Sequence, residues 1–269
     1  MMSKRIFLLG AAILALCACQ PRLVIIHTND THSHMEPVRG GANDGLGGVV
    51  ERAAFIDSVR IAEGEDRVLL LHAGDFCQGS TYFSELGGNM EPRIINDLRY
   101  DCIALGNHEF DNDIEDLCRR VKMLDNTKVV CANLDLSPFE LGDYVKPYTI
   151  IERGGMKIGI IGMEADISTC VANTVCSRIP VYDNLEVVGK WETYLHDVEE
   201  CDLIILLSHL GYDNDQKIVP HTKWINLIVG GHSHTFVDDI VYVRNSRGRK
   251  VAVVTDGQWG LEMGEIKVY

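Results

Sequence analysis

The chain has 269 residues, of which 46% are apolar, and it carries a formal charge of −14 at pH 7. The apolar content is ample for a buried core, which excludes an intrinsically disordered protein. The acidic balance argues against nucleic acid as a partner, because binding to nucleic acid depends on Lys and Arg side chains that neutralise phosphates.

The first residues have the layout of a secretory signal. Lys4 and Arg5 precede the uncharged, mainly apolar residues 6–16, and a segment of small residues and cysteines follows. The apolar run is too short for a membrane span. The end of the segment resembles a bacterial lipoprotein signal, in which the cysteine after the cleavage point is lipidated. A buried first helix is the alternative interpretation.

Cys19 fits the lipidation position better than Cys17, because the bulky Leu16 then lies three positions before the cysteine rather than next to it. We therefore expect residues 1–18 to be a signal peptide and residues 19–269 to form a single domain. The lipid would anchor the domain to a membrane on its periplasmic or cell-surface side.

Apolar runs alternate with amphipathic segments along the rest of the chain. Continuous apolar runs are typical of strands covered on both faces, and they predict strands at 23–26, 68–71, 102–105, 129–131, 203–207 and 227–229. Helical periodicity predicts helices at 49–63, 112–124 and 185–199, the first closed by Gly64. Hairpins are predicted at 147–163, turning at Gly154–Gly155, and at 239–254. Parallel and antiparallel strands together indicate an α/β fold with mixed sheets.

Five predicted strands end in a cluster of polar residues: "HTNDTHSH" (27–34), "HAGDF" (72–76), "GNHEFD" (106–111), "SHLG" (208–211) and "GGHSH" (230–234). A single His or Asp after a strand is more often a helix cap or a turn former. The carboxyl ends of strands are, however, where open α/β sheets build ligand sites. The recurrence at five strand ends therefore predicts a site at one edge of the fold.

The residue types in these clusters are those of a metal site. Asp30 with His32, and His232 with His234, are i, i+2 pairs, and in extended backbone both members of such a pair point the same way. Carboxylates, imidazoles and an amide oxygen, with no thiolate, suit zinc, manganese or iron. The candidate ligands, too many for one tetrahedral ion and enough for two, are Asp30, His32, Asp75, Asn107, His209, His232 and His234.

The five clusters, in this order, resemble the motifs of the calcineurin-like metallophosphoesterases. "HTNDTHSH", "GDFCQGS", "GNHEFD" and "SHLGYDND" look specifically like the 5′-nucleotidase family. The resemblance implies two mixed β-sheets packed as a sandwich flanked by helices, in four α/β/β/α layers. It implies two divalent ions, the first held by Asp30, His32 and His234, the second by Asn107, His209 and His232, with Asp75 bridging them.

The resemblance further implies that His108 is the catalytic imidazole and that Asp111 orients it. The implied function is an exported two-metal phosphomonoesterase that hydrolyses nucleotides or related phosphate esters by in-line attack of an activated water. A 2′,3′-cyclic-nucleotide phosphodiesterase and a non-catalytic metal-binding lipoprotein are the alternatives. Members of the family usually carry a C-terminal domain that stacks on the base. Because this chain stops at Tyr269, we expect that domain to be absent or supplied by a separately encoded partner.

Three features near these motifs have simpler interpretations. Glu109 is expected to be a structural residue or one that supports the ligands from outside the metal site. The glycine-rich segment 40–48 lacks the pattern of a phosphate-binding loop, so we expect a flexible loop at the rim of the site. Cys170 and Cys176 could close a short disulfide in an oxidising compartment, or they could remain free.

Overall fold

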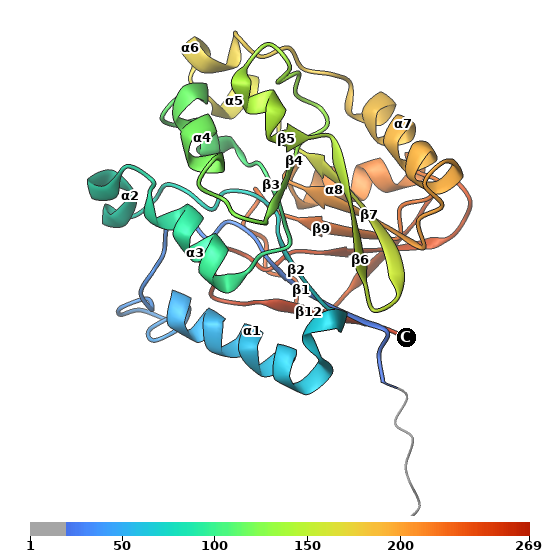
Figure 1. Ribbon diagram of the computed structural model, residues 1–269, viewed down its shortest axis with the longest axis horizontal. Helices are drawn as coiled ribbons and strands as arrows, with labels where there is room; N and C mark the ends of the chain where they lie inside the picture. The colour runs from blue at the N-terminus through green and yellow to red at the C-terminus, as the bar shows by residue number, and fades with distance from the viewer. Residues whose placement is uncertain (1–19) are drawn as a thin grey trace, which may run out of the picture.

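The computed structural model of the protein describes residues 20–269. Within these residues the strands form two mixed sheets of six strands each, with helices on the outer faces (Figure 1). The expected signal peptide and Cys19 lie outside the described residues. In the part of the chain that is described, no helix is long and apolar enough to cross a membrane.

The first sheet has the order β12-β1-β2-β3-β4-β5. Its strands are β1 (Leu23–Thr28), β2 (Val68–His72), β3 (Cys102–Ala104), β4 (Lys128–Val130), β5 (Val145–Lys146) and β12 (Gly264–Val268). Strands β1 to β5 run parallel to one another, whereas β12 pairs antiparallel with β1. The predicted strands of this half are confirmed, and β5 and β12 are additions that the apolar pattern did not indicate.

The second sheet has the order β10-β11-β9-β8-β7-β6. Its strands are β6 (Tyr148–Arg153), β7 (Met156–Met163), β8 (Leu203–Ser208), β9 (Leu227–Gly230), β10 (Val241–Arg244) and β11 (Lys250–Val254). The β6–β7 hairpin closes with Arg153 opposite Met156, which confirms the predicted turn at Gly154–Gly155. β10 and β11 form the second predicted hairpin.

The helices are α1 (Val49–Glu63), α2 (Thr81–Leu86), α3 (Met90–Leu98), α4 (Ile114–Val121), α5 (Ile167–Cys170), α6 (Asn173–Cys176), α7 (Asn184–Asp197) and α8 (Tyr212–Ile218). α1 has the predicted bounds, and its C-terminal cap is Gly64, whose N–H donates to the carbonyl of Arg60. α4 begins two residues later than predicted because Asp113 adopts a positive φ of 86° and its carboxylate accepts a hydrogen bond from the N–H of Ile114, and the helix ends at Val121 rather than at Leu124. α7 lies within two residues of its predicted bounds, whereas α2, α3, α5, α6 and α8 were not predicted.

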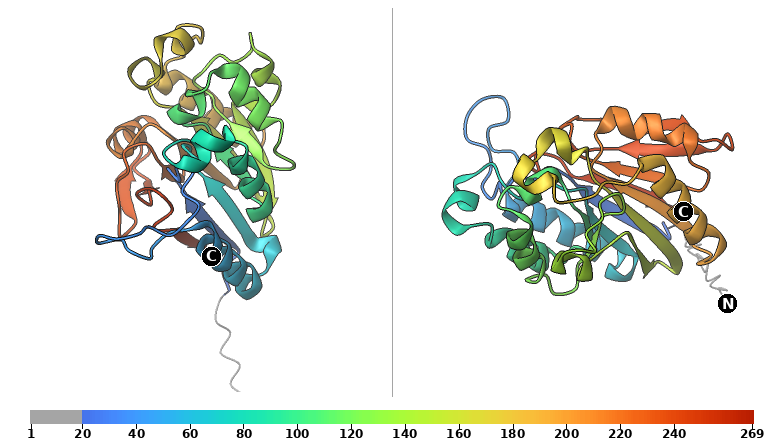
Figure 2. Two further views of the ribbon diagram at one scale, coloured as in Figure 1. Left: turned by 90° about the vertical axis from the view of Figure 1, so that its left-hand side faces the viewer. Right: turned by 90° about the horizontal axis from the view of Figure 1, so that it is seen from above.

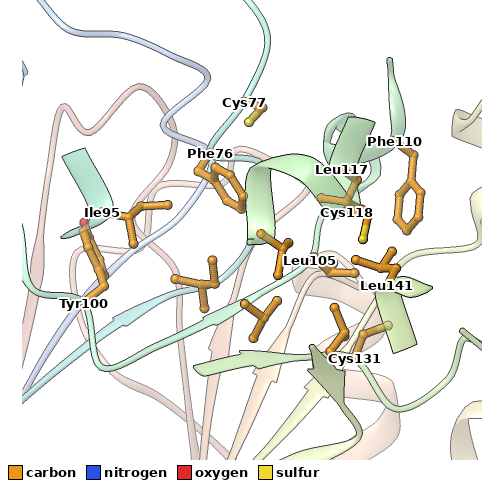
Figure 3. Close-up of a cluster of buried hydrophobic side chains, with 14 of the residues drawn as sticks. Phe76, Cys77, Ile95, Tyr100, Leu105, Phe110, Leu117, Cys118, Cys131 and Leu141 are labelled. Carbon is orange, nitrogen blue, oxygen red and sulfur yellow. The ribbon is translucent and has the colours of Figure 1, made fainter. Parts of the chain in front are cut away.

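Alternation along the strands builds the layers. On β1, Leu23 and Ile25 face the second sheet, while Val24 and Ile26 face the helices. The core between the sheets is apolar from both sides. The outer face of the first sheet packs on α1, α3 and α4, and that of the second sheet packs on α7 and α8. Figure 2 shows these layers from two further sides. Figure 3 shows part of the buried hydrophobic cluster beneath α3 and α4.

The cysteines of residues 20–269 are free thiols. Cys77, Cys102, Cys118 and Cys131 are buried as small core residues. Cys170 and Cys176 are partly exposed and form no disulfide with each other in the structure. Of the two interpretations of this pair, the structure agrees with the one in which both thiols are free.

Candidate metal centre

The candidate ligands lie in loops that follow strands of both sheets. Asp30 and His32 follow β1, Asp75 follows β2, and Asn107 opens a short 3₁₀ helix, η2 (Asn107–Phe110), after β3. His209 directly follows β8, and His232 and His234 follow β9. The carboxyl ends of these parallel strands meet at one edge of the sandwich, as predicted.

The structure gathers these side chains into adjoining groups whose ligand atoms lie within 4.8 Å of one another. One group is Asp30, His32 and His234, and another is Asp75, His209 and His232. A third group, His32, Asp75 and His108, connects them. The two ligand sets implied by the family resemblance are thus each brought together.

The spacings within the groups fit metal ligands. Two atoms that each lie about 2.1 Å from a tetrahedral ion are separated by about 3.4 Å. His234 Nε2 lies 3.4 Å from Asp30 Oδ1 and 3.0 Å from His32 Nε2. On the other side, His209 Nε2 lies 3.0 Å from Asp75 Oδ2. The donors therefore already have the separation that shared coordination requires.

Asp75 lies between the two groups. Its Oδ2 is 3.0 Å from His209 Nε2 and 3.9 Å from His32 Nε2. The amide oxygen of Asn107, in turn, lies 2.8 Å from Nδ1 of His232, which places Asn107 beside the second group. This arrangement suits a carboxylate shared by two ions and an amide oxygen that contacts one of them.

His209 shows how the fold orients a candidate ligand. Its Nδ1 donates a hydrogen bond to the carbonyl oxygen of Ala73 at 2.6 Å. That bond fixes the tautomer and turns Nε2 toward Asp30 and Asp75, and this buried atom has no hydrogen-bond partner of good geometry. Orientation of an imidazole through its second nitrogen is the usual support of a metal-binding histidine.

The charges of the cluster respond to this crowding. Burial lowers the pKa of His209, but the carboxylate of Asp75 outweighs burial and leaves that pKa well above its ordinary value. Burial raises the pKa of Asp75, but the charge of His209 outweighs burial and brings that pKa below the ordinary range. Two buried carboxylates among imidazoles thus attract positive charge, which divalent ions can supply. The residues present fit a dimetal site.

The backbone of the ligand loops is not extended, so the predicted reason for the convergence of the i, i+2 pairs is wrong. Left-handed φ angles of 46° to 74° occur at Asp30, His32, Asp75, His232 and His234. A non-glycine residue in this region costs of order 1–3 kcal/mol, and such residues cluster at functional sites. The tight turns carry His232 and His234 into different groups, rather than into one.

Glu109 holds two of the ligand loops together, in agreement with its expected structural role. It is buried, and its carboxylate accepts hydrogen bonds from the main-chain N–H groups of Asp75, Cys77 and Gly106, at 2.8, 3.1 and 2.6 Å. Burial, followed by the charge of Asp75, raises the pKa of Glu109 to about 8. The loop after β2 and the 3₁₀ helix after β3 are therefore fixed to each other by one side chain.

Asn29 is a supporting residue that sequence reasoning missed. Its Nδ2 donates to Oδ2 of Asp30 at 2.6 Å and to the carbonyl of Gly257 at 2.7 Å. Its Oδ1 accepts the N–H of Asp256 at 2.8 Å. Asn29 thus orients Asp30 and ties its loop to a segment far away in the sequence. It stands inside "HTNDTHSH", but its partners could not be inferred from that motif.

His108 and Asp111 form the dyad that the resemblance implies. Nδ1 of His108 lies 2.8 Å from Oδ2 of Asp111, and the N–H of His108 donates to Oδ1 of Asp75 at 2.9 Å. The His108 side chain is about one-third exposed, as is that of the candidate ligand His234. The ring is 5.3 Å from that of His32, between centroids. His108 therefore faces solvent at the edge of the cluster.

Comparison with known proteins agrees with this geometry. The family model for calcineurin-like phosphoesterases matches residues 23–236. A snake venom 5′-nucleotidase of Gloydius brevicauda is 32% identical, covering 96% of this chain and 47% of that protein. The 5′-nucleotidase of Bos taurus is 31% identical, covering 98% of this chain and 49% of that protein. The chain thus spans about half the length of these relatives.

Solved structures give the same result. A 5′-nucleotidase precursor from Thermus thermophilus superposes with a TM-score of 0.84 at 34% identity, over 91% of this chain and 51% of that chain. The NAD nucleotidase of Haemophilus influenzae superposes with a TM-score of 0.81 at 28% identity, over 90% and 46%. With the family model matching most of its length, this chain belongs to the calcineurin-like phosphoesterase family.

Proposed function

We propose that this protein is an exported two-metal phosphomonoesterase of the 5′-nucleotidase type. The observation that carries the proposal is the position of Asp75, which lies beside both ligand groups and also accepts the main-chain N–H of His108. One carboxylate thereby connects the candidate metal site to the candidate catalytic imidazole. In this proposal Asp30, His32 and His234 hold one ion, Asn107, His209 and His232 hold the other, and Asp75 is shared.

Two divalent ions, when bound, supply an activated water and the positive charge that attracts phosphoryl oxygens. His108 would assist the leaving group and the phosphoryl group. Its Nδ1 is engaged by Asp111, which leaves Nε2 as the nitrogen free to donate a proton to the leaving oxygen or to stabilise charge on the phosphoryl group. The hydrogen bond to Asp111 raises the pKa of His108, which favours a protonated ring near neutral pH.

A nucleotide is the substrate class that we propose. Relatives named 5′-nucleotidase and a neighbour named NAD nucleotidase support it. This chain spans only about half the length of each of them, and the family resemblance places base-stacking contacts in a C-terminal domain. We therefore propose a phosphatase with weak discrimination among leaving groups, or one that is completed by a separately encoded specificity domain.

Export and membrane anchoring are part of the same proposal and rest on the sequence of residues 1–19. Only Gln20, Pro21 and Arg22 separate Cys19 from β1. Three residues reach roughly 10–14 Å at about 3.4 Å per residue, so a lipid on Cys19 would hold the domain close to the membrane. Mass spectrometry of the N-terminal peptide after expression with the native signal should find the acyl chains. Soluble protein with an unmodified peptide would contradict the anchor.

Hydrolysis assays with the purified, manganese-loaded chain test the proposed reaction. The panel is AMP, an aryl phosphate, 2′,3′-cyclic AMP and a bis-aryl phosphate diester. We expect the two monoesters to be hydrolysed at higher kcat/KM than the two diesters. Faster hydrolysis of the cyclic nucleotide than of AMP would instead identify a phosphodiesterase. Two bound ions without hydrolysis of any compound would identify a non-catalytic metal-binding protein.

A further inference from the structure

Beneath the loop that carries Asp30 and His32 lies a small polar chamber that plays no part in the proposed reaction. Its walls include Ser33, Arg52, His72, Glu91 and Tyr100, with about 20 Å³ of room for the centre of a water molecule. Phe76, Ile95 and Tyr100, which Figure 3 labels, provide apolar wall surface. The chamber lies between the first sheet, α1 and α3.

The chamber contains two opposite charges that are nearly fully buried. Arg52 on α1 is 5% exposed, and Glu91 in the first turn of α3 is 3% exposed. Within residues 20–269, neither side chain has an ion-pair partner within 4.0 Å, although both line the same cavity. Nε and Nη1 of Arg52 and Oε2 of Glu91 are buried without a hydrogen-bond partner. Buried charges of this kind are costly unless something satisfies them.

The chamber has room for one water molecule. A water needs roughly 10–15 Å³ of such room and two to four polar partners, and the chamber offers about 20 Å³ together with two donors and one acceptor. A bridging water also explains how two charges in one small chamber can lie too far apart for a direct ion pair. The result would be an Arg52–water–Glu91 bridge between α1 and α3.

The bridge is connected to the ligand loop through Ser33. The hydroxyl of Ser33 donates to Oε1 of Glu91 at 2.5 Å. Ser33 directly follows His32, and both residues have left-handed φ angles, 54° and 46°. The N–H groups of His32 and Ser33 donate to the carbonyls of Asp75 and Phe76. Glu91 thus holds the side chain of Ser33, which lies next to His32 in the same left-handed turn.

Arg52 supports the same turn from a second direction. Its Nη2 donates to the carbonyl of His34 at 3.3 Å. The guanidinium also packs on Gly260, where a Cβ would lie 2.8 Å from Cδ of Arg52 and nearer still to Nη1. The neighbouring Trp259 donates its N–H to the carbonyl of Asp30 at 2.6 Å. Arg52 therefore contacts the loop that carries Asp30 and the segment around Gly260, whose neighbour Trp259 donates to it.

We propose that Arg52, Glu91 and a buried water form a support that acts through Ser33 to position His32 and so sets the affinity of the ion held by Asp30, His32 and His234. This inference rests on the proposed two-metal function. Ser33, Arg52 and Glu91 are positioning residues, because none of them touches the candidate site directly. Loss of such a support typically lowers metal affinity about 10–100-fold.

A high-resolution crystal structure tests the water. We expect one ordered water within hydrogen-bond distance of Arg52 and Glu91. A direct Arg52–Glu91 ion pair, or a chamber without density, would overturn the bridge.

Cobalt(II) titration of the metal-free protein, followed by visible absorbance, tests the positioning role without relying on catalysis. Ser33→Ala and Glu91→Gln should each weaken one of two ions about 10–100-fold and leave the other within about twofold. The double variant should bind that ion little more weakly than the single variant with the larger loss of affinity, because both changes act on one connection. Glu85→Gln, an exposed change on α2, is the matched control and should bind both ions as the unaltered protein does.

If Glu91→Gln does not fold, Ser33→Ala decides alone, since it removes one hydroxyl and leaves the buried charges in place. Two ions bound by Ser33→Ala with unaltered affinity would overturn the inference while leaving the proposed function intact. If the unaltered protein binds fewer than two ions, the proposed two-metal function is wrong. The proposed support for one of those ions is then wrong as well.

Discussion

Gly106 should tolerate no side chain, and Gly106→Ala is therefore a sharp test of how the candidate site is built. Gly106 has φ −120° and ψ 173°, which any residue adopts, so the substitution carries no backbone penalty. A Cβ at this position would lie 2.9 Å from Cγ of Asp75 and closer still to the Asp75 amide nitrogen and Oδ1. Ordinary carbon contacts are about 3.5–4.0 Å, so Asp75 must move by about 0.6 Å or more.

The displaced Asp75 should affect both ions, because its carboxylate lies beside both ligand groups. A displacement approaching 1 Å costs on the order of 10²-fold in rate, which corresponds to about 2.7 kcal/mol of barrier. Overpacking of the buried site should also lower the free energy of unfolding by roughly 1–3 kcal/mol. We therefore expect kcat/KM for an aryl phosphate to fall about 100-fold, with fewer than two ions retained per chain.

The assay compares Gly106→Ala with Gly189→Ala, measuring metal content, kcat/KM and the thermal midpoint of each purified protein. Gly189 lies in α7, and a Cβ built there meets no atom within 4 Å. Alanine in a helix interior is favoured over glycine by about 1 kcal/mol, so Gly189→Ala should be active and slightly stabilised. The steric reasoning is refuted if Gly106→Ala retains both ions and the kcat/KM of the unaltered protein.

Asp75→Ala should lose bound metal and activity together, measured by metal analysis and aryl phosphate hydrolysis, and a fully active variant would sink the two-ion assignment. His108→Ala should keep the ions but lose roughly 10²–10³-fold in kcat, because it removes the proton donor and not a ligand; an emptied metal site would contradict that division. Asp111→Asn should do less damage to kcat, since it disturbs only the orienting partner. The chain alone should prefer AMP to an aryl phosphate by less than about 100-fold in kcat/KM, because base stacking is worth roughly 1–3 kcal/mol; a larger preference would reveal a nucleoside pocket within this chain.

The elements that were predicted from sequence are those with the strongest local signals. Continuous apolar runs identified the central strands, and helical periodicity with a terminal glycine identified α1 to the residue. β12 was missed because its sequence, "GEIKV", holds only Ile266 and Val268 as apolar residues that reach the core. α2 has six residues, too few for a helical period to stand out. Tertiary pairing, rather than local preference, decides such segments.

The candidate site was also predicted only in part: its residues were, but the backbone turns that hold them were not. The residue types at five strand ends were sufficient to predict which side chains gather, and the structure brings all of them together. The left-handed turns that orient these side chains could not be predicted. The strained backbone conformation at Asp30 and His32 is held in place by contacts from other elements. Asn29, for example, is tied to Gly257 across 228 positions of sequence. Periodicity and motif spacing contain no information about partners at such separations.

The dependence of hydrolysis on the number of bound ions tests the central claim most directly. Metal-free protein would be titrated with manganese(II) while ions per chain and the rate of aryl phosphate hydrolysis are measured in the same samples. Two ligand groups joined by Asp75 predict little activity up to one ion per chain and a rise to a plateau at two. A plateau at one ion, or two bound ions with no hydrolysis, would contradict the account.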